Sequence, residues 1–278
     1  MDLTASSDSF LIDQSVTSTR PSRLPTLFLE KIWGTKDLAP WHPPQAESIG
    51  EVWFQADLPL LVKFIFTSAR LSVQVHPNDE FARKHENSRG KTEMWHILRA
   101  EPGAQIALGF REPITPEQLK ETAKSGEIVD LLNWVNVGVG DTFFVPAGTI
   151  HAIGAGLALC EIQQHSDVTY RIYDYGRNRE LHLDRGMEVC KTSALDAKPV
   201  RLPVACPYFH TESATLVHAQ DFEPNPRRFE MTIFLEGQGR IGDQPYSAGE
   251  AWLVPAGGQP YRVEPHQGVT RILRTWVP

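Results

Sequence analysis

A chain of 278 residues exceeds the usual size of one domain, so one large or two small domains with ample hydrophobic cores are expected. The formal net charge is −7 and no run of basic residues occurs, which argues against nucleic-acid binding because that needs a basic surface. No stretch of about 18 apolar residues is present, so no membrane span is expected.

The three cysteines, Cys160, Cys190 and Cys206, are widely spaced and predict neither a disulfide framework nor a CxxC metal site. Unpaired cysteines are typical of a reducing compartment. The first residues also lack the basic and apolar stretches of a signal peptide. A cytoplasmic location is therefore expected.

Beyond an arm over residues 1–22, which is rich in Ser, Thr and Asp and expected to dock only loosely, the chain is predicted to be mainly β. Pro (21) and Gly (20) are abundant, which favours many turns and short strands. Apolar runs bounded by turn residues predict strands at 51–54, 59–66, 71–75, 92–98, 105–110, 142–145, near 152, 157–163 and 169–173, with more in the last 70 or so residues.

A few short helices are predicted between the strands, mostly from their capping residues. Thr115-Pro116-Glu117-Gln118 forms a capping box with Pro at the first helical position. The predicted helices are 78–86 with Asn78 as N-cap, one that begins at Thr115 and ends at Gly126, a second over 128–135, and 183–190 with Asp184 as cap.

One stretch of sequence occurs twice. Gly140–Gly148 (GDTFFVPAG) and Gly249–Gly257 (GEAWLVPAG) both contain a turn, an apolar strand and a Pro-Ala-Gly corner. The first copy continues to His151, whereas the second continues through Gln259 and Tyr261 with no histidine. The repeat predicts two related β-barrels, of which only the first retains a polar centre.

Polar side chains cluster on the predicted strands of the first barrel. Gln74 and His76 are two residues apart and share a face, as do Lys91 and Glu93. Burying such groups without partners would cost several kcal/mol each. A divalent cation, most simply zinc, resolves that cost, because two imidazoles, a carboxylate and an amide oxygen suit it. His151 supplies the second imidazole. The positive site would favour an oxyanion.

Two further residues follow the second half of the first barrel. Glu161 alternates with apolar residues and shares a face with Gln163. Arg171 lies in the apolar segment VTYRIYD, where an arginine either pairs with a carboxylate or binds an anionic ligand. His96 and Asp174 are expected to be structural.

Four motifs in order resemble those of type I mannose-6-phosphate isomerase (phosphomannose isomerase). They are SVQVHP at 72–77, GKTEMW at 90–95, VPAGTIHA at 145–152 and DVTYRIYD at 167–174, and the resemblance covers about residues 24–278. It implies two cupin (double-stranded β-helix, jelly-roll) barrels, one zinc ion per chain, and interconversion of mannose 6-phosphate and fructose 6-phosphate.

The resemblance also implies residue roles and domain limits. The zinc ligands fall on Gln74, His76, Glu93 and His151, and the catalytic residues on Lys91, Glu161 and Arg171. The implied division is an arm (1–22), a catalytic cupin domain (23–195) and a C-terminal cupin domain without metal (196–278). A short helical insert at 115–135 stands where longer members carry a helical domain.

Moving a proton between C2 and C1 through a cis-enediol needs a base and stabilisation of the developing oxyanion. Burial is expected to raise the pKa of Glu161 toward the working range. Lys91 is expected to carry a proton or stabilise an oxygen, and Arg171 to bind the enediolate or the phosphate. The expected partner is a small-molecule sugar phosphate, and the chain is expected to be a monomer or homodimer.

Three other functions remain open from the sequence. A metal cupin can be an iron or manganese oxygenase, although Gln74 and Lys91 speak against it. It can also isomerise a different sugar phosphate. A non-catalytic sugar-binding protein is a third possibility, for which Gln259 and Tyr261 mark the C-terminal barrel.

Overall fold

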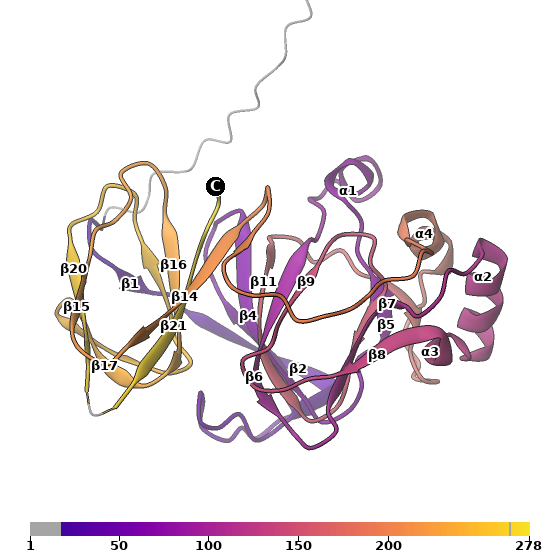
Figure 1. Cartoon of the computed structure of the whole chain (residues 1–278), viewed down its shortest axis with the longest axis horizontal. Coiled ribbons are helices and arrows are strands. Elements are labelled where there is room, and N and C mark those ends of the chain that lie inside the picture. The colour runs from indigo at the N-terminus through magenta and orange to yellow at the C-terminus, as the bar shows by residue number, and fades with distance from the viewer. Residues whose placement is uncertain (1–17, 267) are drawn as a thin grey trace, which may run out of the picture.

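Two β-barrels lie side by side in the computed structural model, which describes residues 18–266 and 268–278. In Figure 1 the N-terminal barrel is purple to salmon and the C-terminal one orange to yellow. The predicted mainly β, two-barrel cupin architecture is confirmed. Within the described residues, no helix is long and apolar enough to cross a membrane.

The N-terminal barrel consists of a six-stranded and a five-stranded sheet. The larger sheet has the order β2-β3-β4-β11-β6-β9, with β2 Thr26–Thr35, β3 Ile49–Phe54, β4 Leu60–Thr67, β11 Leu157–Gln164, β6 Glu93–Ala100 and β9 Thr142–Val145. The smaller has the order β12-β5-β10-β7-β8, with β12 Tyr170–Tyr173, β5 Val73–Val75, β10 His151–Ile153, β7 Gln105–Phe110 and β8 Leu132–Asn136. The named strands of these two sheets all pair antiparallel, which suits sheets packed on one core.

The C-terminal barrel also has two sheets, and it takes one strand from the start of the chain. One sheet has the order β1-β19-β16-β21-β14-β13, with β1 Ser22–Arg23, β19 Ala251–Val254, β16 Glu230–Glu236, β21 Thr270–Trp276, β14 His210–Leu216 and β13 Val204–Ala205. The other has the order β15-β20-β17-β18, with β15 Gln220–Phe222, β20 Tyr261–Pro265, β17 Gln238–Ile241 and β18 Gln244–Ser247.

The end of the expected arm pairs with the C-terminal barrel. In β1, Ser22 lies opposite Leu253 of β19. The amide of Gln259 donates to the carbonyl of Thr19 at 2.7 Å. Residues 1–17 of the expected arm lie outside the described residues.

Local capping signals located the first two helices correctly. α1 (Asp79–Glu86) begins where the Asn78 side chain accepts from the Phe81 amide at 2.9 Å. α2 (Pro116–Ser125) has the full capping box at Thr115 and ends at Gly126, whose φ of 90° suits glycine.

Two expectations about helices are wrong. The helix expected over 128–135 stops early: α3 is Ile128–Leu131, and the chain continues as β8 because Val135 pairs with Ile106 of β7. α4 (Leu183–Val189) starts after His182 and has no side-chain cap. Asp184 lies inside the first turn, where a carboxylate favours the helix dipole but does not cap.

The two barrels share a hydrophobic core. Phe54, Phe64 and Met94 of the first barrel belong to the same buried cluster as Met231 and Leu253 of the second. The indole of Trp41 in the first barrel donates to the carbonyl of Leu235 in the second at 2.8 Å. The barrels therefore stabilise each other through burial of apolar surface.

The sequence repeat occupies matching places in the two barrels. In the first, Glu93 of β6 lies opposite Val145 of β9, and in the second, Glu230 of β16 lies opposite Val254 of β19. The expectation that only the first barrel has a polar centre needs correction. Arg274 binds Glu230 through Nε at 2.7 Å and Nη2 at 2.6 Å, so the second centre holds an ion pair.

Candidate active site

Three of the four expected ligands converge inside the N-terminal barrel. The ligand atoms of His76, Glu93 and His151 lie within 4.8 Å of one another, and all three side chains are buried. His76 Nε2 is 3.6 Å from one Glu93 oxygen, and His151 Nε2 is 3.5 Å from the other. The antiparallel pairing of β5 with β10 brings these strands together.

Backbone carbonyls orient both imidazoles. His76 Nδ1 lies 2.9 Å from the carbonyl of Val168, and His151 Nδ1 lies 2.9 Å from that of Thr149. A carbonyl only accepts, so Nδ1 carries the proton in each ring and the Nε2 lone pair faces Glu93. Burial lowers the pKa of His151 to about 4, and burial with the charge of Lys91 lowers the pKa of His76 well below its usual value. Both rings are therefore neutral, as metal ligands must be.

The fourth expected ligand, Gln74, lies directly beside this group. Its amide nitrogen is 3.2 Å from His151 Nε2, and a half-turn of the amide would direct its oxygen to the same point. Glu93 Oε1 is buried without a hydrogen-bond donor among the described residues. The unpartnered carboxylate oxygen and two inward lone pairs fit a divalent cation such as zinc.

Lys91 places an ammonium against the same group. It donates to His76 Nε2 at 3.1 Å and to Glu93. Burial and the charge of Glu161 raise the pKa of Glu93 to about 7, although Lys91 works in the opposite direction. A cation bound beside Glu93 would therefore lower the pKa of this carboxyl and favour the ionised carboxylate.

Charges of alternating sign continue from Lys91 across four neighbouring strands. Lys91 is 3.5 Å from Glu161 of β11, and Glu161 is 3.2 Å from Lys63 of β4. Lys63 in turn is 3.6 Å from Glu51 of β3, which is 3.2 Å from Lys31 of β2. We call these five residues the charge row. Each ion has a counter-ion on an adjacent strand, which offsets the cost of burial.

Sequence reasoning missed Lys63 and Glu51. All eight residues of β4 (LLVKFIFT) are buried, and Lys63 is its only ionisable one. A single lysine inside such an apolar run was a usable signal, because lysine is almost never fully buried without a partner. Glu51 gave no comparable signal.

The expected titration of Glu161 is wrong. Burial alone would raise its pKa, but the ammonium groups of Lys91 and Lys63 lower it to about 2. The Trp95 indole also donates to Glu161 at 2.9 Å and favours the charged form. Glu161 is therefore a carboxylate at neutral pH.

Arg171 lies next to Gln74 in the register of β12 with β5. Its Nη1 donates to the carbonyl of Glu180 at 2.7 Å, whereas its Nε is buried without a partner in the part of the chain that the structure describes. Asp174, which was expected to be structural, binds Arg179 through both oxygens at 2.7 and 2.6 Å. His96 Nδ1 is 2.8 Å from Thr142 Oγ1.

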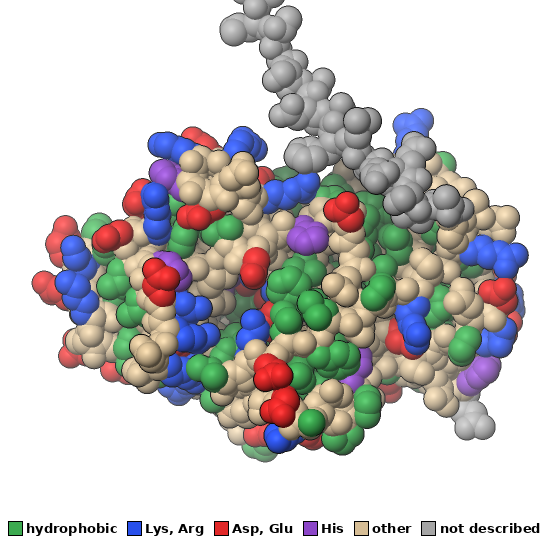
Figure 2. All heavy atoms as spheres, turned by 180° about the vertical axis from the view of Figure 1, so that it is seen from behind, with side chains coloured by type: hydrophobic (Ala, Val, Ile, Leu, Met, Phe, Trp, Pro, Cys, Tyr) green, Lys and Arg blue, Asp and Glu red, His purple; other side chains and the backbone are tan. Residues whose placement is uncertain are grey.

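A cavity of about 250 Å³ connects these groups. Its lining includes Gln74 beside the metal-ligand group, the charge row, and at one side Arg171 and Arg179. Figure 2 shows Lys and Arg side chains close together over the N-terminal barrel, in the left half of the view. The cavity lining itself holds more basic than acidic side chains although the whole chain is acidic, as an anionic ligand requires.

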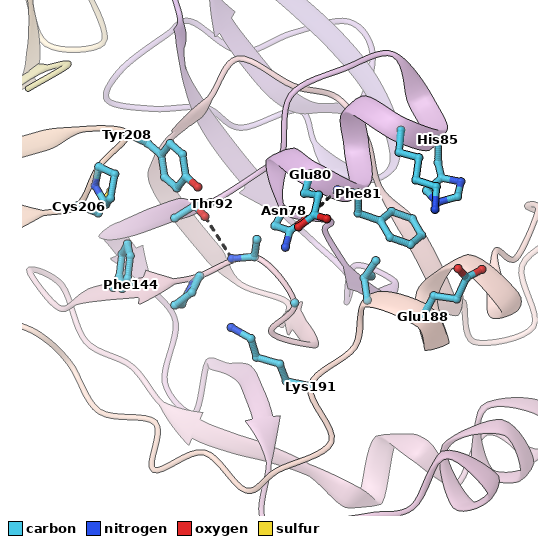
Figure 3. A pocket seen from close by; sticks show the side chains of 16 residues that line it. Asn78, Glu80, Phe81, His85, Thr92, Phe144, Glu188, Lys191, Cys206 and Tyr208 are labelled. Atoms are coloured by element: carbon cyan, nitrogen blue, oxygen red, sulfur yellow. Dashed lines mark hydrogen bonds between the residues drawn. The ribbon is translucent and has the colours of Figure 1, made fainter. Parts of the chain in front are cut away.

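A larger hollow of about 630 Å³ lies elsewhere on this barrel (Figure 3). It is lined by α1 side chains such as Phe81, by Thr92 and by Tyr208 from the chain that follows the barrel. The dashed line that ends at Thr92 marks the 3.2 Å hydrogen bond that the Ala147 amide donates to the Thr92 hydroxyl, and both residues line the hollow. None of the expected metal ligands lines this hollow, so it is separate from the candidate active site.

Fold and side chains together define a two-barrel cupin with a candidate metal centre in its N-terminal barrel. No family model matches the chain. Mannose-6-phosphate isomerase ManA of Bacillus subtilis (strain 168) is 36% identical over 228 residues, which cover 74% of this chain and 72% of that protein. The chain therefore belongs to the mannose-6-phosphate isomerase family.

Solved structures share the fold over nearly the whole chain. The mannose 6-phosphate isomerase of Bacillus subtilis superposes with a TM-score of 0.83 at 25% identity, covering 92% of this chain and 99% of that one. A zinc-bound mannose 6-phosphate isomerase superposes with a TM-score of 0.71 at 16% identity, covering 93% of this chain and 99% of that one. The second likeness concerns the fold alone.

Proposed function

We propose that this protein interconverts mannose 6-phosphate and fructose 6-phosphate through a cis-enediol. The observation that carries the proposal is the convergence of His76, Glu93 and His151 beside a cavity lined by buried lysines and Glu161. The mannose-6-phosphate isomerase ManA supports the same substrate.

We assign one zinc ion to Gln74, His76, Glu93 and His151. The neutral imidazoles, the unpartnered Glu93 oxygen and the adjacent amide support this ligand set. The zinc-bound isomerase of the same fold supports the identity of the metal. When bound, zinc acts as a Lewis acid that polarises a sugar oxygen.

Arg171 is assigned to the anionic part of the substrate. The sequence left two roles open for it, ion pair or anion site. Among the described residues no carboxylate lies within ion-pair distance of its guanidinium, and Nε has no acceptor. An unpaired guanidinium at a cavity wall suits phosphate or an enediolate.

The proton work is assigned to Glu161 and the two lysines beside it. Glu161 is ionised, so it can accept the proton from C2 and return it to C1. The O2–H proton is lost and O1 gains one, which balances the exchange. Lys91 and Lys63 can stabilise the negative oxygen while the enediol forms, because both ammonium groups flank this carboxylate.

Specific contacts argue against two of the alternative functions, a sugar-binding protein and an oxygenase. Tyr261 is buried and stacks on Phe222 at 5.4 Å, so most of its ring is covered within the C-terminal barrel and is not free to stack on a sugar. The lysines at the metal-ligand group favour sugar-phosphate chemistry over an oxygenase. A different sugar phosphate remains the second candidate.

A coupled assay tests the proposal. Purified protein should convert mannose 6-phosphate to fructose 6-phosphate, lose that activity with a chelator, and regain it with zinc. Glucose 6-phosphate and ribose 5-phosphate serve as comparison substrates. Faster turnover of either, or full activity after verified removal of metal, would contradict the proposal.

The cytoplasmic location and the monomeric or homodimeric state stay predictions. The three cysteines are free, which supports a reducing compartment. Fractionation of cells and light scattering of the purified protein would measure the two properties.

A further inference from the structure

The Lys63 ammonium is held between two carboxylates at the wall of the active-site cavity. It is 3.2 Å from Glu161 and 3.6 Å from Glu51. The three strands that carry these residues are neighbours in the order β3-β4-β11. Burial alone would lower the pKa of Lys63, but Glu161 and Glu51 together raise it, so the ammonium stays charged.

Glu51 is itself fixed by two donors. The Trp53 indole donates to one of its oxygens at 2.6 Å, and the Lys31 ammonium lies 3.2 Å from the other. Trp53 also faces Lys63 in the register of β3 with β4, and its ring centroid is 4.8 Å from the ammonium. Glu51 therefore has little freedom to leave Lys63.

We propose that Glu51 is a positioning residue that acts through Lys63 and takes no part in the chemistry itself. This inference rests on the proposed isomerase function. Glu161 Oε1 is the closest Glu161 oxygen to both Lys63 and Lys91, at 3.2 and 3.5 Å. Without Glu51, Glu161 is the one carboxylate left within ion-pair distance of Lys63 among the described residues, and the ammonium draws closer to it. That shift blocks the oxygen that the reaction needs and moves the ammonium away from the substrate.

The C-terminal barrel supplies a matched control. Glu250 accepts from the indole of Trp252, two residues on, at 3.0 Å and pairs with Arg23 at 3.1 Å. This is the same carboxylate–indole arrangement as in Glu51 and Trp53, and Glu250 is similarly shielded, but no active-site cavity adjoins it. A purely structural role predicts similar effects of substitution at both positions.

The experiment is a double-mutant cycle on mannose 6-phosphate isomerisation, with zinc content and thermal stability measured for every variant. Glu51→Gln should lower kcat about 10-fold or more, with KM changed less than about 3-fold, because it misplaces a group used in the transition state. In a Lys63→Met background the same substitution should change kcat less than about 2-fold. Glu250→Gln should match the wild type.

A conservative variant separates the proposed positioning role from a loss of activity caused by misfolding. Glu51→Asp keeps the charge, so it should lose less activity than Glu51→Gln, and its loss should vanish in the Lys63→Met background. Full activity of Glu51→Gln, an undiminished loss in that background, or no loss on Lys63→Met alone would each overturn the inference. A wild type without turnover of any sugar phosphate would instead overturn the proposed function.

Discussion

Glu93 and Glu230 hold the same position in the two barrels, each opposite the valine that begins Val-Pro-Ala-Gly. Their counter-charges differ. Glu93 faces two neutral imidazoles and Lys91, whereas both oxygens of Glu230 accept from one edge of the Arg274 guanidinium, through Nε and Nη2. In the second barrel a side chain of the protein supplies the cation that the metal is proposed to supply in the first.

We predict that Arg274→Met destabilises the protein by about 2–4 kcal/mol, because it leaves Glu230 partly buried without a counter-ion. Urea unfolding measures the loss. Arg271 lies on the same strand as Arg274 and forms an exposed ion pair with Glu236 of β16. Arg271→Met should cost less than about 0.5 kcal/mol. Equal losses for the two variants would contradict the role of Arg274.

The ligand assignment predicts metal loss from single substitutions. His151→Ala and Glu93→Gln should each lose most of the zinc, since each removes one of four ligands. Elemental analysis of protein purified in the presence of zinc gives the content per chain. His96→Ala is the control, because His96 contacts Thr142 rather than the ligand group. One zinc per chain in either ligand variant would exclude that residue as a ligand.

The unpaired guanidinium of Arg171 predicts a large effect on turnover. Arg171→Ala should reduce kcat/KM by at least about 100-fold, the scale for losing one positioned charge. Arg171→Lys should recover part of this, since it restores charge without the planar fork. Arg262→Ala in the C-terminal barrel provides the comparison, and wild-type rates in Arg171→Ala would remove Arg171 from the reaction.

The partly buried His96 predicts a pH dependence of stability in the metal-free protein. Burial lowers the pKa of His96 from 6.5 to about 4, so between these values the unfolded chain binds a proton that the folded protein does not. The free energy of unfolding should therefore fall as pH drops from 6.5 to 4 and be unaffected by this group above 6.5. His96→Gln should weaken that fall.

Urea unfolding at several pH values, with the exposed His266→Gln as control, isolates the contribution of His96 from those of other groups. The slopes of unfolding free energy against pH for the two variants should differ only below about pH 6.5. Identical pH dependence in His96→Gln and wild type would show that His96 titrates alike in the folded and unfolded states.

Features set by neighbouring residues in the chain were predictable from sequence. The side chains of Asn78 and Thr115 accept hydrogen bonds from backbone amides in the first turns of their own helices. The local sequence is therefore enough to predict α1 and α2. The convergence of His76, Glu93 and His151 followed from strand alternation combined with motifs of a known family.

Features that depend on distant partners were not predictable. The local pattern predicts a helix through most of β8, because the strand depends on hydrogen bonds to β7, which lie outside that pattern. The pKa of Glu161 depends on Lys63 and Lys91, from two other segments. Burial alone gave the opposite direction, so electrostatics at this site required the three-dimensional arrangement.

The pairing of β1 with β19 has a consequence for biosynthesis. Ser22 and Arg23 are synthesised long before their partners Leu253 and Trp252, from which most of the described chain separates them. The C-terminal barrel thus completes one sheet edge with a segment made long before its other strands, and β1 cannot pair until β19 has been synthesised. A fragment that starts at residue 196 would expose β19 as an open edge, and open edges recruit other chains into aggregates.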